Sequence, residues 1–364
     1  MRTKLLCLLA GLLMASANAV AEPFDRFIGF GDSTIDSGWF IYQPPPAGVN
    51  GPLWLTAIAN GGGKPTTPYG RMVSELLAAR YGLTAFPADR PGGGTNYAAH
   101  GAQNDAALLN PRAPSTVSQI NTYLASVQGV ADAKALYLIS SGGNDRTYAN
   151  NQFVAGVFTQ AQAQNYVIAA ARSLVSAIKQ LQDAGARYLL VPDGQQIVPE
   201  DPAYNANPTS LLAIYHTTLY AGLSAQGVHF IPADRAVLSA AIGANPAAFG
   251  LQFILNSQQA CINPSSATIP RGWALYCTPQ LLVTPNAPQT YLWADAEHYT
   301  AAGQKVLADY YVNLVNAALE SCESAGDDDH HDDRRFDEQH RRLAPVTLCD
   351  LWTTAVPSRN GDRR

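Results

Sequence analysis

The chain has little charge, since only 14% of its 364 residues are Asp, Glu, Lys or Arg, and its formal net charge is -5. No basic stripe occurs along it, which excludes the electrostatic footprint of a nucleic-acid-binding protein. Beyond the N-terminal segment, no apolar run is long enough to cross a bilayer as a helix. A hydrophobic share of 47% still provides for one large domain with a sizeable core. These properties favour small molecules or lipids as partners.

Cysteine is also scarce, with five in the chain. One lies within residues 1–21, where a basic start, a short apolar run and small residues have the layout of a cleavable secretory signal. The other four belong to a compartment that permits disulfides, and they are Cys261, Cys277, Cys322 and Cys349. Three pairings are formally open. We expect the Cys261–Cys277 bridge, because closing a proline-containing loop of this size contributes about 3 kcal/mol.

Short apolar runs alternate with longer helical patterns along the chain. Four runs bounded by turn-forming residues are typical of buried strands, at 26–30, 135–140, 188–191 and 228–231. Six segments predict helices, over 71–81, 117–126, 161–184, 208–225, 235–242 and 301–320. This alternation predicts an α/β fold, a three-layer α/β/α sandwich with a central parallel sheet, in a single domain over residues 22–322.

Two regions depart from this pattern. Residues 41–66 contain runs of proline and glycine, and we expect an irregular surface loop there; the alternative is a loop that lines or covers a pocket. Residues 323–364 are highly charged and have no apolar period, which predicts a disordered tail. Asp and His in this tail also allow a metal-binding interpretation, but nothing there fixes the geometry that a metal requires.

A short apolar run near the start of the chain ends in Gly-Asp-Ser. A strand that ends at Gly31 can place Ser33 at the carboxyl edge of a parallel sheet, where open α/β folds bind their ligands. Ser33 is therefore a candidate nucleophile. The tripeptide by itself is also compatible with an ordinary strand exit, in which Asp or Ser caps the next helix.

A nucleophilic serine needs a general base, and four histidines lie outside the charged tail. His298 precedes a long predicted helix and follows Asp295 by three residues. One helical turn would bring these two side chains to the same face, where the carboxylate can fix the tautomer of the imidazole. The alternative is a capped turn exposed to solvent.

An acyl-transfer site also needs hydrogen-bond donors for the developing oxyanion. Two glycine-containing segments can supply them. In residues 92–102, Gly101 can bring its backbone amide close to a ligand. In residues 138–145, a buried strand ends in Gly-Gly-Asn-Asp, and Asn144 can direct its side-chain amide toward Ser33; a turn or helix cap is its structural alternative.

Taken in chain order, these four segments resemble the sequence blocks of the SGNH, or GDSL-type, hydrolases. The likeness spans residues 27–303 and is greatest to the branch of secreted bacterial lipases and esterases that includes autotransporter passengers. It implies a flavodoxin-like fold and requires no metal or organic cofactor. It also implies site roles: a Ser33 nucleophile, a His298 base oriented by Asp295, and an oxyanion hole formed by the amides of Ser33 and Gly101 and by Asn144.

Two positions depart from the family pattern. Thr34 stands where the family has leucine, and we expect it to alter packing more than chemistry. His100 stands where this branch often has glycine, directly before Gly101. Its side chain can therefore restrict the acyl group or add a polar contact beside the oxyanion hole.

Other functional classes fit less well. The glycines around Gly31 lack the third glycine of a dinucleotide fingerprint, and no Gly-x-Ser-x-Gly elbow occurs. A secreted binding module without activity is the non-enzymatic alternative. We predict a secreted or periplasmic carboxylic ester hydrolase that acts on a small-molecule or lipid ester and can contact lipid peripherally. A phospholipase, acyltransferase or carbohydrate O-acetylesterase on the same site stays open, and the sequence does not indicate the oligomeric state.

Overall fold

The computed structural model describes residues 23–193 and 210–327, with side chains up to residue 321. In this part of the chain a parallel sheet has the strand order β1-β2-β3-β4, with bounds Arg26–Gly31, Ala135–Ser140, Tyr188–Pro192 and Ile231–Ala233. The α/β fold with a parallel sheet is thus confirmed. β4 begins three residues later than predicted, because Val228 belongs to the turn that ends the preceding helix and donates its amide to Leu223.

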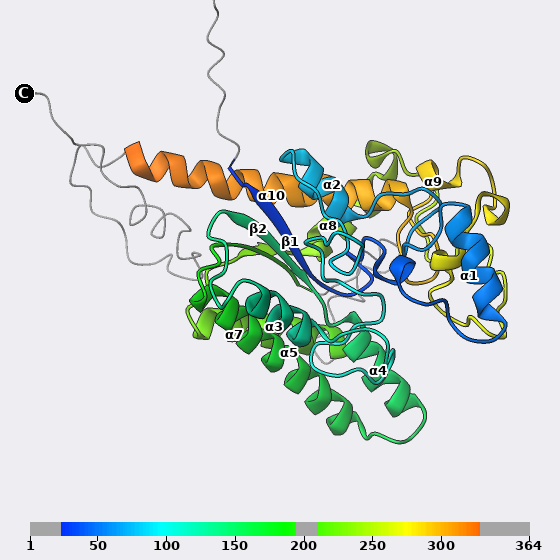
Figure 1. Ribbon diagram of the computed structural model, residues 1–364, viewed down its shortest axis with the longest axis horizontal. Helices are drawn as coiled ribbons and strands as arrows, with labels where there is room; N and C mark the ends of the chain where they lie inside the picture. Colours follow the sequence, from blue (N-terminus) through cyan, green and yellow to red (C-terminus); the bar gives the residue numbers. More distant parts are fainter. Residues whose placement is uncertain (1–22, 194–209, 328–364) are drawn as a thin grey trace, which may run out of the picture.

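Helices cover both faces of the sheet (Figure 1). One face carries α2 (Val73–Arg80), α8 (Arg235–Ala244) and α10 (Ala301–Asp327). The other carries α3 (Thr116–Ser126), α5 (Gln160–Asp183) and α7 (Leu211–Ala225). These are the six predicted helices. α10 extends past its predicted end at residue 320, whereas the predicted secretory signal and most of the predicted tail lie outside the described residues.

Alternation along the strands divides the core into two clusters. Phe27 and Leu138 point into the cluster with α2, α8 and α10, while Ile28 and Ile139 point into the cluster with α3, α5 and α7. Successive side chains of a strand face opposite sides, so a sheet covered on both faces needs apolar residues at every position. This explains why the sequence shows continuous apolar runs at the strands rather than alternating ones.

Two helices of ten or more residues lie where no helix is predicted. α1 (Asn50–Ala59) occupies part of the region expected to be irregular; Pro52 falls in its first turn, where the missing amide costs no hydrogen bond. Pro46, Asn50 and Trp54 of this region line a pocket, so the alternative interpretation of residues 41–66 holds. α4 (Gly143–Val154) packs against α5 and α7, and its mostly polar sequence has no apolar period that would predict a helix.

Several shorter elements are also present. α9 (Ala287–Thr290) and a 3-10 helix over Trp273–Tyr276 lie between α8 and α10, and the 3-10 helix lies within the loop closed by the Cys261–Cys277 disulfide. Further 3-10 helices cover Trp39–Tyr42, Pro246–Phe249 and Pro279–Leu281. The Cys261–Cys277 bridge is the predicted one, and the side chains of Cys322 and Cys349 lie outside the described part. Within the described ranges, no helix is both long and apolar enough to cross a membrane.

The exit from β1 is held in one conformation. Gly31 has a φ of 150°, and a Cβ atom on it would lie 1.9 Å from the carbonyl oxygen of Ser140 in β2, so only glycine fits. Gln119 of α3 accepts from the Gly31 amide at 2.8 Å and donates to the Gly31 carbonyl at 2.9 Å. The chain therefore leaves the sheet in a fixed direction, and Ser33 follows at the carboxyl edge.

Candidate active site

A small cavity of about 80 Å³ lies at the carboxyl edge of the sheet. Ser33 lines it from the turn after β1, Asn144 from the first turn of α4, and His298 from the segment before α10. The structure thus brings three of the predicted site residues together. Asp295 contacts His298 directly, and Gly101 lies next to the residue that Asn144 contacts, although it does not line the cavity itself.

The turn that carries Ser33 is braced by its neighbours. Asp32 accepts hydrogen bonds at Oδ1 from the Thr34 amide at 2.9 Å and from the Thr34 hydroxyl at 2.8 Å. Burial raises the pKa of Asp32. Thr34 therefore contributes a hydrogen bond that leucine could not make, where we expected an effect on packing. Within the described part of the chain, the Ser33 amide has no hydrogen-bond acceptor.

The start of α4 is tied to the segment that contains Gly101. Asn144 donates from Nδ2 to the carbonyl of Ala102 at 2.8 Å, which leaves its second amide hydrogen outside this bond. Gly101 has a φ of 84°, and a Cβ atom there would lie 2.7 Å from Cβ of Asn110. Its amide, like that of Ser33, donates to no group among the described residues. Neither predicted amide donor is therefore used by a hydrogen bond within the described part of the chain.

Asp295 and His298 meet in a tight turn and not on a helix, so the predicted helical turn is wrong. The turn lies between Trp293 and Tyr299, which form an antiparallel bridge just before α10. Asp295 Oδ1 accepts from the amides of Glu297 and His298 at 2.8 Å each, and His298 Nδ1 lies 3.0 Å from both carboxylate oxygens. Asp295 is fully buried and His298 is 5% exposed, which excludes a solvated turn.

Each of these two groups sets the pKa of the other. Burial alone would raise the pKa of Asp295 and lower that of His298. Their mutual attraction and hydrogen bonding outweigh burial, so the pKa of Asp295 lies below its ordinary value and the pKa of His298 lies above it. The carboxylate is therefore ionised, and it favours the tautomer with the proton on Nδ1.

The disulfide loop supplies a further support for Asp295 that the sequence did not predict. The amide of Ala274, in the 3-10 helix of that loop, donates to Asp295 Oδ2 at 2.8 Å. At the start of the loop, the amide of Cys261 donates to the carbonyl of Ala294 at 2.9 Å. The donors of both hydrogen bonds are backbone amides, so the residue types in the sequence do not predict these bonds.

A second histidine lies beside His298. The ring of His100 is 5.3 Å from the His298 ring, and its amide donates to Asp36 Oδ2 at 2.8 Å. Burial lowers the pKa of His100 to about 3, so the ring is neutral. Asp36 also accepts from the amides of Gly38 and Trp39 at 2.7 Å each, and it thereby joins the first predicted segment to the second. This role of Asp36 was not predicted.

We predict that opening the disulfide weakens the Asp295–His298 pair. In the double variant Cys261→Ser, Cys277→Ser, the Ala274 amide is held less firmly, so the pKa of His298 should fall toward its ordinary value. Loop closure also contributes about 3 kcal/mol to the free energy of unfolding. NMR titration of the histidine rings and urea unfolding measure the two effects, with Cys322→Ser as the control. An unchanged His298 pKa in the double variant would contradict the coupling.

No group of three or more His, Cys, Asp or Glu residues within the described ranges is arranged to hold a metal ion. A serine hydroxyl, a buried His–Asp pair and two backbone amides without an acceptor among the described residues lie near one edge of the sheet. This is the combination of groups that acyl transfer requires.

The sequence profile described as GDSL-like Lipase/Acylhydrolase matches residues 28–311. The chain is 31% identical over 350 residues to Esterase EstA of Pseudomonas aeruginosa, across 86% of this chain and 50% of that protein. It is 30% identical over 184 residues to Lipase 1 of Photorhabdus luminescens, across 50% of this chain and 24% of that protein. The chain thus spans about half the length of EstA. It belongs to the GDSL-like lipase/acylhydrolase family.

Proposed function

We propose that this protein is a secreted serine esterase or lipase that hydrolyses carboxylic esters through an acyl-enzyme on Ser33. The observation that carries the proposal is that Ser33, Asn144 and His298 line one cavity while Asp295 holds His298 Nδ1 at 3.0 Å. Family membership supports an ester as the substrate class.

In the first step, His298 takes the Ser33 proton at Nε2 while Oγ attacks the ester carbonyl carbon. Asp295 keeps Nδ1 protonated and stabilises the imidazolium that forms. The oxyanion accepts hydrogen bonds from the amides of Ser33 and Gly101 and from Asn144 Nδ2. Each such donor is worth about 10²- to 10³-fold in rate.

In the second step, His298 returns its proton to the departing alkoxide, and the alcohol leaves. A water molecule then attacks the acyl-enzyme with His298 as base again, and the acid is released as Ser33 recovers its proton. Apart from the ester and one water molecule, every group that acts in these two steps belongs to this chain. The site suits glycerides, phospholipids, thioesters and O-acetylated carbohydrates alike, so the acyl and alcohol parts of the substrate are not assigned by it.

Secretion is part of the proposal. Its support is the signal-like layout of residues 1–21, together with a disulfide in the loop that braces the site. A binding module that has lost activity is the alternative from another class. The positions proposed for chemistry all carry side chains or amides competent for it, which favours the enzyme.

We predict that Ser33→Ala lowers kcat for para-nitrophenyl butanoate by about 10³-fold or more, since it removes the nucleophile. Asn144→Ala should lower kcat by about 10²-fold, because it removes one oxyanion donor. Asn151→Ala, on the exposed side of the same helix α4, is the matched control and should leave kcat unchanged. If circular dichroism shows that both proteins are folded and Ser33→Ala turns over the ester as fast as the wild type, the proposal of an enzyme that acts through Ser33 is wrong.

We predict that kcat/KM rises with pH through the pKa of His298, which lies above the ordinary value of 6.5, because only the neutral imidazole accepts the Ser33 proton. Burial also raises the pKa values of Asp36 and Asp145, to about 6 and about 7. Because these carboxyl groups titrate in a similar pH range, the variant Asp295→Asn is needed to assign the rise in kcat/KM to His298. Without its carboxylate partner, the pKa of His298 falls.

In Asp295→Asn the rising limb should therefore move to lower pH, and the plateau should fall by about 10³- to 10⁴-fold. Asp309→Asn, which removes an exposed carboxylate of α10 paired with Lys305, is the control and should reproduce the wild-type profile. The assignment fails if the limb of Asp295→Asn stays in place, or if the wild-type profile is flat across this range.

A further inference from the structure

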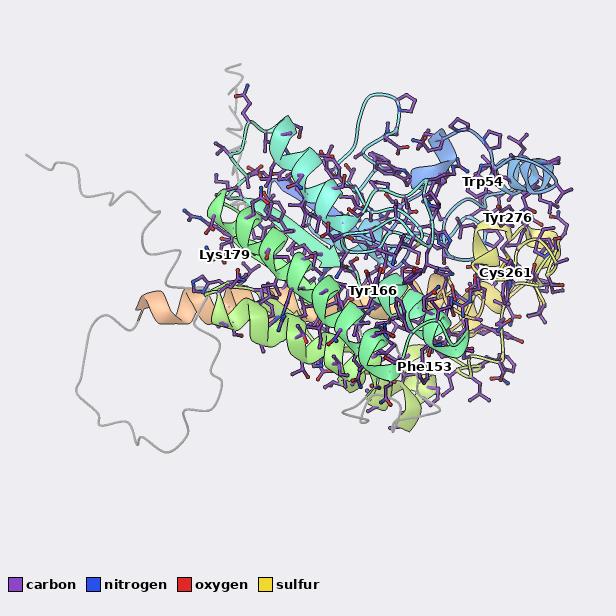
Figure 2. The ribbon with its side chains drawn as sticks, turned by 90° about the horizontal axis from the view of Figure 1, so that it is seen from below. Trp54, Phe153, Tyr166, Lys179, Cys261 and Tyr276 are labelled. Carbon is purple, nitrogen blue, oxygen red and sulfur yellow. A yellow bond between two sulfur atoms is a disulfide. The ribbon has the colours of Figure 1, made fainter. Side chains whose placement is uncertain are left out.

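A second and larger pocket lies at the end of the molecule where α1 meets the disulfide loop. Its volume of about 460 Å³ falls in the range of small-molecule sites. It shares no lining residue with the cavity at Ser33. Figure 2 shows Trp54 of α1 beside Tyr276, with Cys261 close to them. The two rings are 5.5 Å apart and form one wall of the pocket.

The pocket adjoins the proposed catalytic histidine at two points. His100 lines it, and the His100 ring is 5.3 Å from the His298 ring. Gly272 also lines it, and a Cβ atom there would lie 3.7 Å from His298 Cε1 and 3.0 Å from His100 Nε2. One imidazole thus separates the pocket from His298. The pocket therefore borders the histidine that lines the cavity at Ser33.

The lining of the pocket combines aromatic rings with positive charge. Arg112 and Arg271 line it, and no Asp or Glu does. Arg271 Nη1 lies 3.3 Å from Glu297 Oε1, an ion pair exposed enough to be weak. His100 adds no charge, because burial keeps it neutral at any pH above its lowered pKa of about 3. The lining therefore carries two guanidinium groups and no carboxylate of its own.

Arg112 is held at the pocket without being neutralised. Its guanidinium lies 5.1 Å from the centre of the Phe40 ring, and Nη2 donates to the carbonyl of Pro44 at 2.5 Å. Neither partner carries a charge. Because a guanidinium has five N–H donors, most of them stay available to a ligand. Arginine in this setting matches the two oxygens of a carboxylate or phosphate.

We propose that this pocket, the arginine pocket, binds an anionic group attached to an apolar part of the ester substrate. The inference rests on the proposed function, because it requires the ester bond to lie at Ser33. Trp54 and Tyr276 contact the apolar part, while Arg271 and Arg112, which lies over the Phe40 ring, bind the carboxylate or phosphate. Esters with a negative charge at this distance from the carbonyl are then the preferred substrates over neutral ones of the same size.

Two substrate pairs test the proposal and show which half of the ester enters the pocket. On the acyl side, para-nitrophenyl hexanoate is compared with the mono-para-nitrophenyl ester of hexanedioic acid, in which a carboxylate replaces the terminal methyl group. On the alcohol side, para-acetylphenyl butanoate is compared with para-carboxyphenyl butanoate. The quantity measured is the ratio of kcat/KM for the anionic member to that for the neutral member.

We predict that Arg112→Gln and Arg271→Gln each lower this ratio about tenfold for one of the two pairs, since each removes a charged hydrogen bond to the anion. The ratio should be higher in Arg112→Lys than in Arg112→Gln, because lysine keeps the positive charge. In the wild type, added salt should lower the ratio. Arg90→Gln is the matched control: its guanidinium lies 4.0 Å over the Phe86 ring, outside the arginine pocket, and the ratio should not change.

The outcomes separate the two proposals. If the wild type hydrolyses the neutral esters but neither arginine variant changes either ratio, the arginine pocket does not bind an anionic group and the proposed function stands. If Arg90→Gln changes a ratio as much as Arg112→Gln does, the preference comes from net charge and the pocket assignment is wrong. If no ester of either pair is hydrolysed, the proposed function fails and the substrate assignment fails with it.

Discussion

The buried carboxylate of Asp295 is the constraint on which the site depends. It is fully inaccessible to solvent, and an unpaired charge there would cost several kcal/mol. The amides of Ala274, Glu297 and His298 and the His298 ring satisfy it together. The disulfide loop, the turn before α10 and the imidazole must therefore meet at one point. The same loop carries Gly272, so the wall of the arginine pocket is positioned by the same carboxylate.

The sequence predicts those parts of the fold in which the type of each residue follows from the burial of its own side chain. A sheet covered on both faces requires apolar side chains at every strand position, and β1 and β2 show such runs. α5 has one apolar face and was predicted nearly to its ends. α4 has no such face: it is fixed by Asn144 on the Ala102 carbonyl and by Gly142, where a Cβ atom would lie 2.1 Å from Cζ of Tyr215. Contacts of this kind leave no period in the sequence.

At the site, the residue types were predictable but the backbone that holds them was not. Ser33, Asn144 and His298 meet as expected, yet Asp295 reaches His298 through a turn and not along a helix. The supporting amides, such as that of Ala274, belong to residues of no distinctive type. The arginine pocket was hidden for the same reason, since its walls come from residues far apart in the chain, including Trp54 and Arg271. The resemblance to the family predicts the residues of the reaction. It does not predict a neighbouring pocket such as this one, which only the structure shows.

Covalent labelling shows whether Ser33 is an activated nucleophile. The folded protein is incubated with an alkyl fluorophosphonate, whose phosphorus an activated serine attacks with loss of fluoride to form a phosphonate ester. The product is then digested and mapped by mass spectrometry. If Ser33 is the nucleophile and His298 its base, a single adduct forms on the peptide that contains Ser33, and it is lost in His298→Ala, because the hydroxyl is then no longer deprotonated. An adduct on another residue, or none on a folded protein, would show that Ser33 is not the nucleophile.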